Sequence, residues 1–239
     1  STASDPFIPH HRRSRSSGCP HQAVPISDPT DTSPPPTVRD RISGGARGIA
    51  GPVIRGLVRI GATPNTVTTI GFLLVATSVP FIIREQWLWA FFFFTIGSIS
   101  DLLDGSIARL TGKSSRFGAF LDSTLDRFAE GIVLGAVGIS FGRNEQWWAL
   151  AAAFTALTAS FLISYTRARA EGLGIDSNTG GLMSRPERLF LLGAGCFFQY
   201  WIDNALAVVV SILAVLSLIT VIQRVFHVWS VLKEDGAPD

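Results

Sequence analysis

Long apolar segments dominate the sequence from residue 66 onward, and short polar stretches separate them. The segments run approximately Thr66–Ile83, Trp87–Leu103, Phe117–Phe141, Trp147–Tyr165, Leu189–Trp201 and Ala205–Trp229. A helix needs about 20 apolar residues to cross the hydrocarbon core of a bilayer, and several segments reach that length. The fifth segment is short unless it begins near Pro186 and ends near Asp203. The pattern predicts an all-α integral membrane protein with six transmembrane helices.

A basic amphipathic stretch precedes the first apolar segment. Between residues 38 and 60, isoleucine, leucine and valine positions interleave with Arg39, Arg41, Arg47, Arg55 and Arg59. A helix of this kind is typical of a membrane surface, where its arginines meet the lipid head groups. We therefore expect an interfacial helix at 38–60 that leads directly into the first span.

The two ends of the chain differ from its middle. Residues 1–37 are poor in apolar residues and rich in serine, proline and histidine. We expect a disordered tail there, because such a segment buries too little surface to offset the entropy of ordering. The predicted membrane domain covers 38–232, with six spans from about 66 to 229, and a C-terminal tail follows at 233–239. The N-terminus has no apolar signal-peptide region, so we expect no secretory signal.

Composition and charge narrow the function classes. The chain of 239 residues is 47% apolar and 16% charged, with a formal net charge of +2. This charge is too small to indicate nucleic-acid binding, and no aromatic-basic RNA motif is present. The two cysteines, Cys19 and Cys196, give neither a disulfide framework nor the spacing of a zinc site.

Basic residues are distributed unevenly among the polar stretches. They collect before the first span, after the second and fourth spans and near the C-terminus, whereas the alternate loops hold only Arg84 and Arg143. Because basic loops stay on the cytoplasmic side, we expect both termini and the basic loops in the cytoplasm. The predicted location is the cell membrane, with multiple passes.

Four aspartates lie where a membrane protein rarely tolerates charge. Asp101 and Asp104 end the second apolar segment, three positions apart, and Asp122 and Asp126 lie four positions apart inside the third. Each pair therefore shares one helix face. An unpaired carboxylate in this setting is costly, so four of them need a common reason.

A divalent cation would provide that reason. Two acidic faces on adjacent helices can converge on one polar cavity, where their like charges repel one another unless a cation neutralises them. Carboxylate oxygens are ligands for Mg²⁺, Mn²⁺ or Ca²⁺, and no histidine or cysteine lies nearby to favour zinc. The predicted loop between the helices holds small residues and one arginine, namely Gly105, Ala108, Arg109, Gly112 and Gly118. Small residues let a bulky ligand approach the backbone, and arginine can pair with phosphate.

The acidic and small residues together form a longer pattern. Its fixed positions are Asp101, Asp104, Gly105, Ala108, Arg109, Gly118, Asp122 and Asp126. This pattern resembles the signature of the CDP-alcohol phosphotransferases at every defining position and at the family spacing. The resemblance covers residues from about 40 to 230, and six spans preceded by an amphipathic helix are similar to that family as well.

The resemblance implies roles for individual residues. Asp101, Asp104 and Asp122 would bind Mg²⁺ or Mn²⁺, as two ions, and Asp126 beside them in the metal site would be the general base. The CDP end of the donor lipid would lie against Asn65, Thr68, Asp101, Gly105, Ala108, Arg109 and Gly118. A homodimer is also implied, because members of the family tend to form dimers.

A second set of residues resembles the actinobacterial phosphatidylinositol phosphate synthases within this family. The similar stretches are 164–171, 185–188 and 223–229. In that subfamily, cationic residues hold the phosphate of inositol phosphate, and the matching positions are Arg167, Arg188 and Arg224. The subfamily often has lysine at the first of these and aspartate where Asn65 stands. Because arginine cannot shed its charge in lipid, Arg224 is expected to face the bundle interior or a polar pocket.

The resemblance therefore implies transfer of the phosphatidyl group from CDP-diacylglycerol to inositol phosphate, with release of CMP. Within the family, glycerol 3-phosphate as the acceptor and an ether-lipid CDP donor are the alternatives. A cation transporter is an alternative of another class, but its polar residues would be spread through the membrane depth instead of gathering at helix ends. A non-catalytic membrane scaffold would leave the acidic pattern unexplained.

Overall fold

The computed structural model describes Gly56, Arg59, residues 61–111, 115–175 and 182–234, and Gly236, except the side chains of residues 102, 104–106 and 108–111. The predicted tail at 1–37 lies outside the described residues, as does the predicted interfacial helix at 38–60 apart from Gly56 and Arg59. The helices are α2 (Pro64–Ile83), α3 (Trp87–Thr111), α4 (Arg116–Arg143), α5 (Trp147–Gly172), α6 (Arg185–Phe198) and α7 (Ala205–Glu234). The all-α prediction is confirmed for the described part of the chain.

Each predicted apolar segment corresponds to one helix, but several ends differ. The prediction of a loop at Gly105 to Arg109 is wrong, because α3 continues to Thr111. Its apolar face continues through Ile107, which is fully buried and packs with Val67 of α2. Helix α6 has only 14 residues, and α7 runs to Glu234, so the predicted C-terminal tail begins two residues too early.

Capping side chains fix where three of the helices begin. The Thr66 amide donates to Thr63 Oγ1 at 3.2 Å at the start of α2, where Pro64 opens the helix. The Gly118 amide donates to Ser115 Oγ at 2.9 Å at the start of α4. The Ser184 amide donates to Glu187 Oε2 at 2.6 Å at the start of α6. Each contact satisfies an N–H group that helix geometry leaves unpaired.

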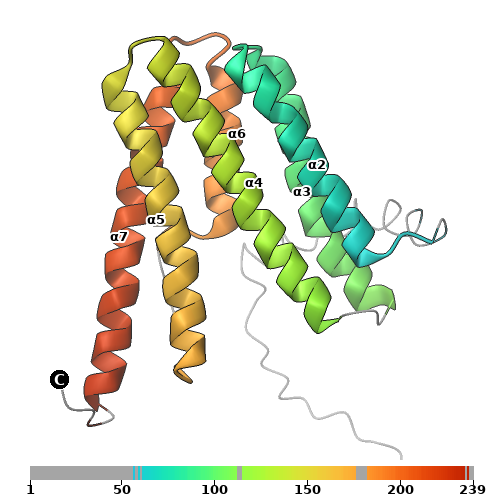
Figure 1. Ribbon diagram of the computed structural model, residues 1–239, viewed down its shortest axis with the longest axis vertical. Coiled ribbons are helices and arrows are strands. Elements are labelled where there is room, and N and C mark those ends of the chain that lie inside the picture. The colour runs from blue at the N-terminus through green and yellow to red at the C-terminus, as the bar shows by residue number, and fades with distance from the viewer. Residues whose placement is uncertain are drawn as a thin grey trace, which may run out of the picture. The chain divides into compact units, whose positions relative to one another are not determined.

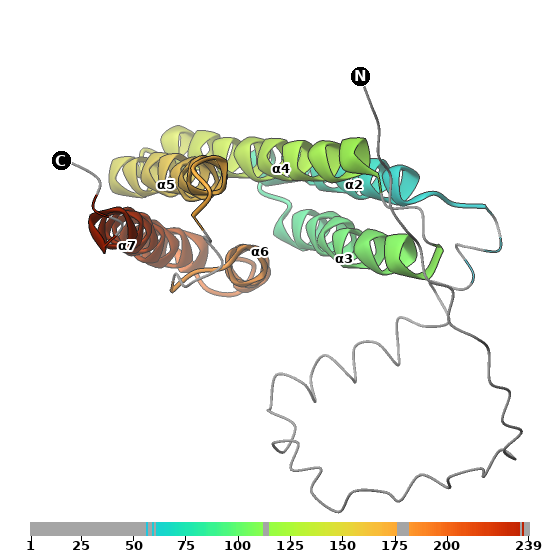
Figure 2. The same ribbon diagram turned by 90° about the horizontal axis from the view of Figure 1, so that it is seen from below.

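The helices form a ring in which each one packs mainly against two others. The order around the ring is α2, α3, α6, α7, α5, α4 and back to α2. Figure 2 shows the same arrangement as two layers, with α2, α4 and α5 in one and α3, α6 and α7 in the other. Consecutive helices run in opposite directions (Figure 1), so alternate connections lie at the same end of the bundle.

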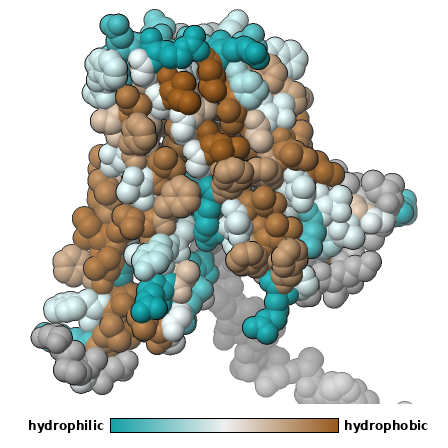
Figure 3. All heavy atoms as spheres, in the orientation of Figure 1, coloured by the Kyte–Doolittle hydropathy of each residue, from teal (hydrophilic) through white to brown (hydrophobic). Residues whose placement is uncertain are grey.

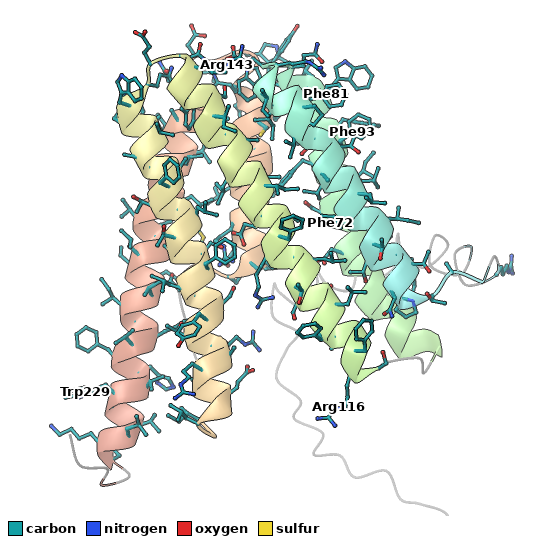
Figure 4. All side chains as sticks on the ribbon, in the orientation of Figure 1. Phe72, Phe81, Phe93, Arg116, Arg143 and Trp229 are labelled. Atoms are coloured by element: carbon teal, nitrogen blue, oxygen red, sulfur yellow. The ribbon has the colours of Figure 1, made fainter. Side chains whose placement is uncertain are left out.

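Close contacts hold α2 against α3 and α4. A Cβ atom at Gly97 of α3 would lie 2.7 Å from the Gly71 carbonyl oxygen, so only glycine allows the two backbones to approach so closely. This contact brings Asp101, one turn after Gly97, against α2. On the other side of α2, the ring of Phe72, labelled in Figure 4, stacks on that of Phe128 with centroids 5.5 Å apart.

The outer surface of the bundle is apolar. Helices α2, α5 and α7 are long and apolar enough to cross a membrane, judged by length and composition among the described residues. Figure 3 shows hydrophobic side chains over much of the helices, a band of hydrophilic ones at the upper end and further hydrophilic ones in the lower half. The exposed large apolar side chains include Ile70, Leu73, Phe154, Phe190, Val215 and Phe226. An exposed apolar surface of this extent is typical of a membrane protein.

Short turns close one end of the bundle, which we call the turn end (residues 83–86, 143–146 and 204). Asn144 Nδ2 donates to Glu85 Oε1 at 2.5 Å, and Arg143 Nη1 donates to the Ile83 carbonyl at 2.8 Å. Gln146 Nε2 donates to Asn204 Oδ1 at 2.9 Å. These bonds join connections that are far apart in sequence, and Figure 4 marks this end by Arg143.

Candidate active site

Three aspartates converge at the opposite end of the bundle. Asp101 comes from α3, whereas Asp122 and Asp126 come from α4, and each offers a carboxylate oxygen within 4.8 Å of the others. We call these three residues the acidic cluster. Asp104 lies on α3 one turn after Asp101, and its side chain is outside the described residues. Two neighbouring segments of the sequence thus meet in space as their spacing predicted.

The acidic cluster fits a divalent cation chemically. Its donors are all carboxylate oxygens, the ligands that Mg²⁺ and Mn²⁺ prefer. Asp122 Oδ1 is buried and has no hydrogen-bond partner. A buried carboxylate oxygen in this state is costly, and a bound cation would remove that cost.

Arg185 supplies positive charge to the acidic cluster. Its Nη1 donates to Asp101 Oδ2 at 2.8 Å, and its Nη2 pairs with Asp126. The guanidinium of Arg185 therefore bridges α3 and α4 from the first turn of α6. The sequence did not assign Arg185 to the site, although it begins the 185–188 stretch from which Arg188 was assigned.

A cavity of about 660 Å³ adjoins the acidic cluster, and we call it the cationic cavity. The predicted base Asp126 lines it. Its arginines come from four helices, and they are Arg127, Arg167, Arg185, Arg188 and Arg224. The structure thus brings the three predicted acceptor-phosphate residues from α5, α6 and α7 into one space with the predicted base.

Three arginines of the cationic cavity lie near one another, because Arg167 and Arg188 are both close enough to Arg224 for their like charges to matter. Arg224 Nη1 donates to the Ile163 carbonyl at 3.2 Å, but its Nε is buried without a hydrogen-bond partner. Arg167 pairs with Glu171 at 2.9 Å, and both side chains are exposed. Clustered guanidinium groups with an unused donor are suited to bind an anion such as phosphate.

Arg188 differs from the other arginines because it is buried in an ion pair. Its Nε and Nη2 donate to Glu130 Oε1 and Oε2 at 2.9 and 3.3 Å. Glu130 was missed by the sequence analysis. A signal was present, because Glu130 follows Asp126 by four positions and so continues the face that Asp122 and Asp126 share.

A second, apolar cavity of about 620 Å³ lies between α3 and α6. Its apolar lining includes Phe91, Phe94, Ile99, Leu189, Phe190 and Phe197. Asp101 and Arg185 line it as well. The apolar cavity therefore meets the acidic cluster, and the acidic cluster in turn meets the cationic cavity.

Among the predicted nucleotide positions, Thr68 lies beside the acidic cluster. A Cβ atom at Gly118 would lie only 2.7 Å from Asn65 Oδ1, so glycine at this position leaves room for the Asn65 side chain against the start of α4. Thr68 Oγ1 donates to the Pro64 carbonyl at 3.0 Å, and Thr68 lines a small space with Asp101 and Asp126. Gly105, Ala108 and Arg109 lie on the last turns of α3, where side-chain positions are outside the described residues.

Comparison with known proteins decides which family carries this arrangement. The sequence profile of the CDP-alcohol phosphatidyltransferases matches residues 62–232. The chain belongs to the CDP-alcohol phosphatidyltransferase family. The resemblance inferred from the acidic pattern is thereby confirmed, and the chain is a transferase of this class.

Relatives with a similar sequence include synthases of inositol lipids. The archaetidylinositol phosphate synthase of Pyrococcus horikoshii is 39% identical over 172 residues, which cover 72% of this chain and 86% of that protein. The phosphatidylinositol phosphate synthase of Streptomyces avermitilis is 38% identical over 181 residues, covering 72% of this chain and 74% of that protein.

Solved structures of the phosphatidylinositol phosphate synthase of Mycobacterium tuberculosis are also similar. The crystal structure with CDP-DAG bound has a TM-score of 0.69 and 34% sequence identity, covering 76% of this chain and 94% of that one. The crystal structure in complex with manganese and citrate has a TM-score of 0.68 at the same identity, covering 74% and 88%. A family member of this fold thus accommodates both a CDP-lipid and a divalent metal.

Proposed function

We propose that this family member transfers the phosphatidyl group of CDP-diacylglycerol to a hydroxyl group of inositol phosphate and releases CMP. One observation carries the acceptor assignment: Asp126 shares the cationic cavity with Arg167, Arg188 and Arg224. An acceptor that bears its own phosphate needs such a cationic site beside the reacting hydroxyl. The names of the relatives agree with this acceptor.

In this proposal Asp126 acts as the base, and its membership of both the acidic cluster and the cationic cavity supports that role. It takes the proton from the acceptor hydroxyl, whose oxygen attacks the β-phosphorus of the donor. The bond from that phosphorus to the CMP oxygen breaks, and the lipid keeps the new phosphodiester. Two divalent ions, Mg²⁺ or Mn²⁺, held by the acidic cluster with Asp104, would neutralise charge on the diphosphate.

The donor lipid occupies the other side of the acidic cluster in this proposal. The apolar cavity reaches Asp101 and Arg185, so an acyl chain in it would place the diphosphate at the acidic cluster. The CDP group would then lie against the predicted nucleotide positions, which are Asn65, Thr68, Gly105, Ala108, Arg109 and Gly118. One similar synthase is named for an archaetidyl lipid and the other for a phosphatidyl lipid, and their identities to this chain are nearly equal. The test therefore compares a diacyl donor with an ether-lipid donor.

The membrane arrangement belongs to the same proposal. All six helices would span the cell membrane, with the active site and both termini in the cytoplasm and residues 38–60 at its surface. The uneven loop charges and the exposed apolar surface support this arrangement. We also propose a homodimer, and chemical cross-linking in native membranes with and without detergent would test it.

An acceptor panel with the purified full chain in lipid nanodiscs tests the function. CMP release and the lipid product are measured with CDP-diacylglycerol or an ether-lipid CDP donor, each with inositol phosphate or glycerol 3-phosphate. We expect CMP release only with inositol phosphate, with the diacyl donor preferred, and only in the presence of Mg²⁺ or Mn²⁺. A product formed only from glycerol 3-phosphate would overturn the assignment of inositol phosphate as the acceptor. Metal flux into liposomes without CMP release under any condition would favour the transporter alternative.

A further inference from the structure

Glu130 and Arg188 form a buried ion pair next to the cationic cavity. The two residues are 6% and 3% exposed, and both guanidinium–carboxylate contacts are within hydrogen-bond distance, at 2.9 and 3.3 Å. Both residues also line the cationic cavity. The pair uses Nε and Nη2 of Arg188, so the third guanidinium nitrogen, Nη1, is left outside it.

The pair also crosses the ring of helices. Glu130 comes from α4 and Arg188 from α6, and these two helices are not among the six principal packed pairs of the described residues. At this depth, α4 and α6 are therefore held in register by side chains and not by close backbone packing. The orientation of the Arg188 guanidinium depends on one carboxylate from the opposite side of the ring.

We propose that Glu130 is a positioning residue, which holds the Arg188 guanidinium so that its remaining nitrogen faces the phosphate of the acceptor. Glu130 is not itself a ligand, because a carboxylate repels phosphate and both of its oxygens already accept from Arg188. Without this carboxylate, the guanidinium would be a buried and unpaired charge whenever no acceptor is bound. Glu130 thus keeps the Arg188 guanidinium in its binding orientation at the cavity wall between turnovers.

A fixed guanidinium gives the acceptor site geometric selectivity. A guanidinium is planar and donates along defined directions, so its plane determines where a phosphate oxygen can bind. Arg167 is exposed and pairs with Glu171 of its own helix, whereas Arg188 is buried and pairs across the ring. We therefore expect Glu130 to set where the phosphate lies and, through it, the distance from the acceptor hydroxyl to Asp126.

Steady-state kinetics of the full-length enzyme test this inference, which rests on the proposed function. For Glu130→Gln, we expect the KM for inositol phosphate to rise about 10- to 100-fold, because misplacing a bound group has effects of that size. The KM for CDP-diacylglycerol is expected to stay at the wild-type value. Glu130→Asp keeps the charge but shortens the reach, so a smaller rise in the acceptor KM is expected.

A double-variant cycle shows whether Glu130 acts through Arg188. Arg188→Ala alone should raise the acceptor KM, and adding Glu130→Gln to it should cause no further rise. Glu145→Gln is the matched control, since Glu145 is an exposed glutamate just after the same helix at the turn end. This control should keep wild-type values of both KM and melting temperature.

The outcomes separate the inference from the function on which it rests. A wild-type chain that does not use inositol phosphate overturns the proposed function and the inference together. If the wild type uses it, a wild-type acceptor KM in Glu130→Gln, with or without a lower melting temperature, leaves Glu130 only a structural role and overturns the inference alone. The inference is also overturned if Glu130→Gln raises the acceptor KM equally in the wild-type and the Arg188→Ala backgrounds. If Glu130→Gln does not fold, an unchanged acceptor KM in Glu130→Asp decides against the inference.

Discussion

The two ends of the helical bundle use similar polar residues in opposite ways. At the turn end, Asn144 and Arg143 donate to Glu85 and to the Ile83 carbonyl, so polar groups of neighbouring turns satisfy one another. At the end with the acidic cluster, carboxylates and guanidinium groups surround a cavity of about 660 Å³. The first end is a closed structural junction, and the second is open to a ligand.

Unsatisfied polar atoms mark the difference most clearly. Among the described residues, the buried side-chain atoms without a hydrogen-bond partner are Asp122 Oδ1, Arg185 Nε, Ser217 Oγ and Arg224 Nε. Three of the four belong to the acidic cluster or the cationic cavity. Each such group costs about 1–3 kcal/mol, so a fold that retains several in one place is adapted to groups that bind there. Variants matched between the two ends can test this contrast.

The largest expected effect is that of Asp126→Asn. Removal of the proposed base should lower the rate of CMP release by about 10²- to 10⁴-fold, because general-base catalysis contributes that much. Binding of CDP-diacylglycerol should remain measurable by titration, since the other donor contacts are kept. The comparison at the turn end is Asn144→Ala, which removes the bond to Glu85. We expect it to lower stability by about 1 kcal/mol and to leave turnover unchanged.

Wild-type turnover of Asp126→Asn would remove the base assignment and leave Asp126 as part of the acidic cluster only. Lost turnover in Asn144→Ala at an unchanged melting temperature would contradict the contrast between the ends. It would mean that the turn end takes part in the reaction.

A smaller effect is expected from a pair of arginine variants. Arg224→Ala should raise the KM for inositol phosphate by about 10- to 100-fold, because a charge-assisted bond to phosphate is lost. The KM for CDP-diacylglycerol should change little. Arg143→Ala removes the same charge at the turn end, where the side chain donates to a backbone carbonyl. It should leave both KM values unchanged, and an equal rise from both variants would show that Arg224 acts only through net charge.

Much of the fold could be predicted because one physical rule governs it. The apolar segments follow from the length of helix needed to bury a chain in lipid, and each became one helix. The continuation of α3 to Thr111 was missed because polar residues interrupt the apolar run after Leu103. The contact of Ile107 with Val67, a tertiary feature, extends the apolar face.

In the site, contacts within one helix could be predicted from the sequence, whereas contacts between distant segments could not. Spacing within one helix predicted the acidic faces, and the structure places Asp101, Asp122 and Asp126 together. Glu130 continued one of these faces and could have been predicted from spacing alone. The partners of Asp101 and Glu130 could not, because Arg185 and Arg188 lie 84 and 58 positions away. Which arginine meets which carboxylate depends on how the ring closes.

The smallest expected effect concerns Arg185, the residue that most distinguishes the two ends. Its guanidinium bonds two members of the acidic cluster, Asp101 and Asp126. A divalent cation at the acidic cluster would bind carboxylate oxygens of the same residues. We therefore expect Arg185 and the metal to compete.

Arg185→Ala is thus expected to tighten Mn²⁺ binding by about three- to tenfold, since a partly exposed charged bond is worth only a modest free energy. The loss of the free Mn²⁺ signal in electron paramagnetic resonance measures this affinity without substrate or turnover. Arg143→Ala, with the same change of charge, should leave the affinity unchanged. Weaker Mn²⁺ binding in Arg185→Ala would mean that Arg185 organises the carboxylates for the metal instead of competing with it. Arg185 would then assist metal binding by holding the carboxylates in place, as Arg143 holds the Ile83 carbonyl at the turn end.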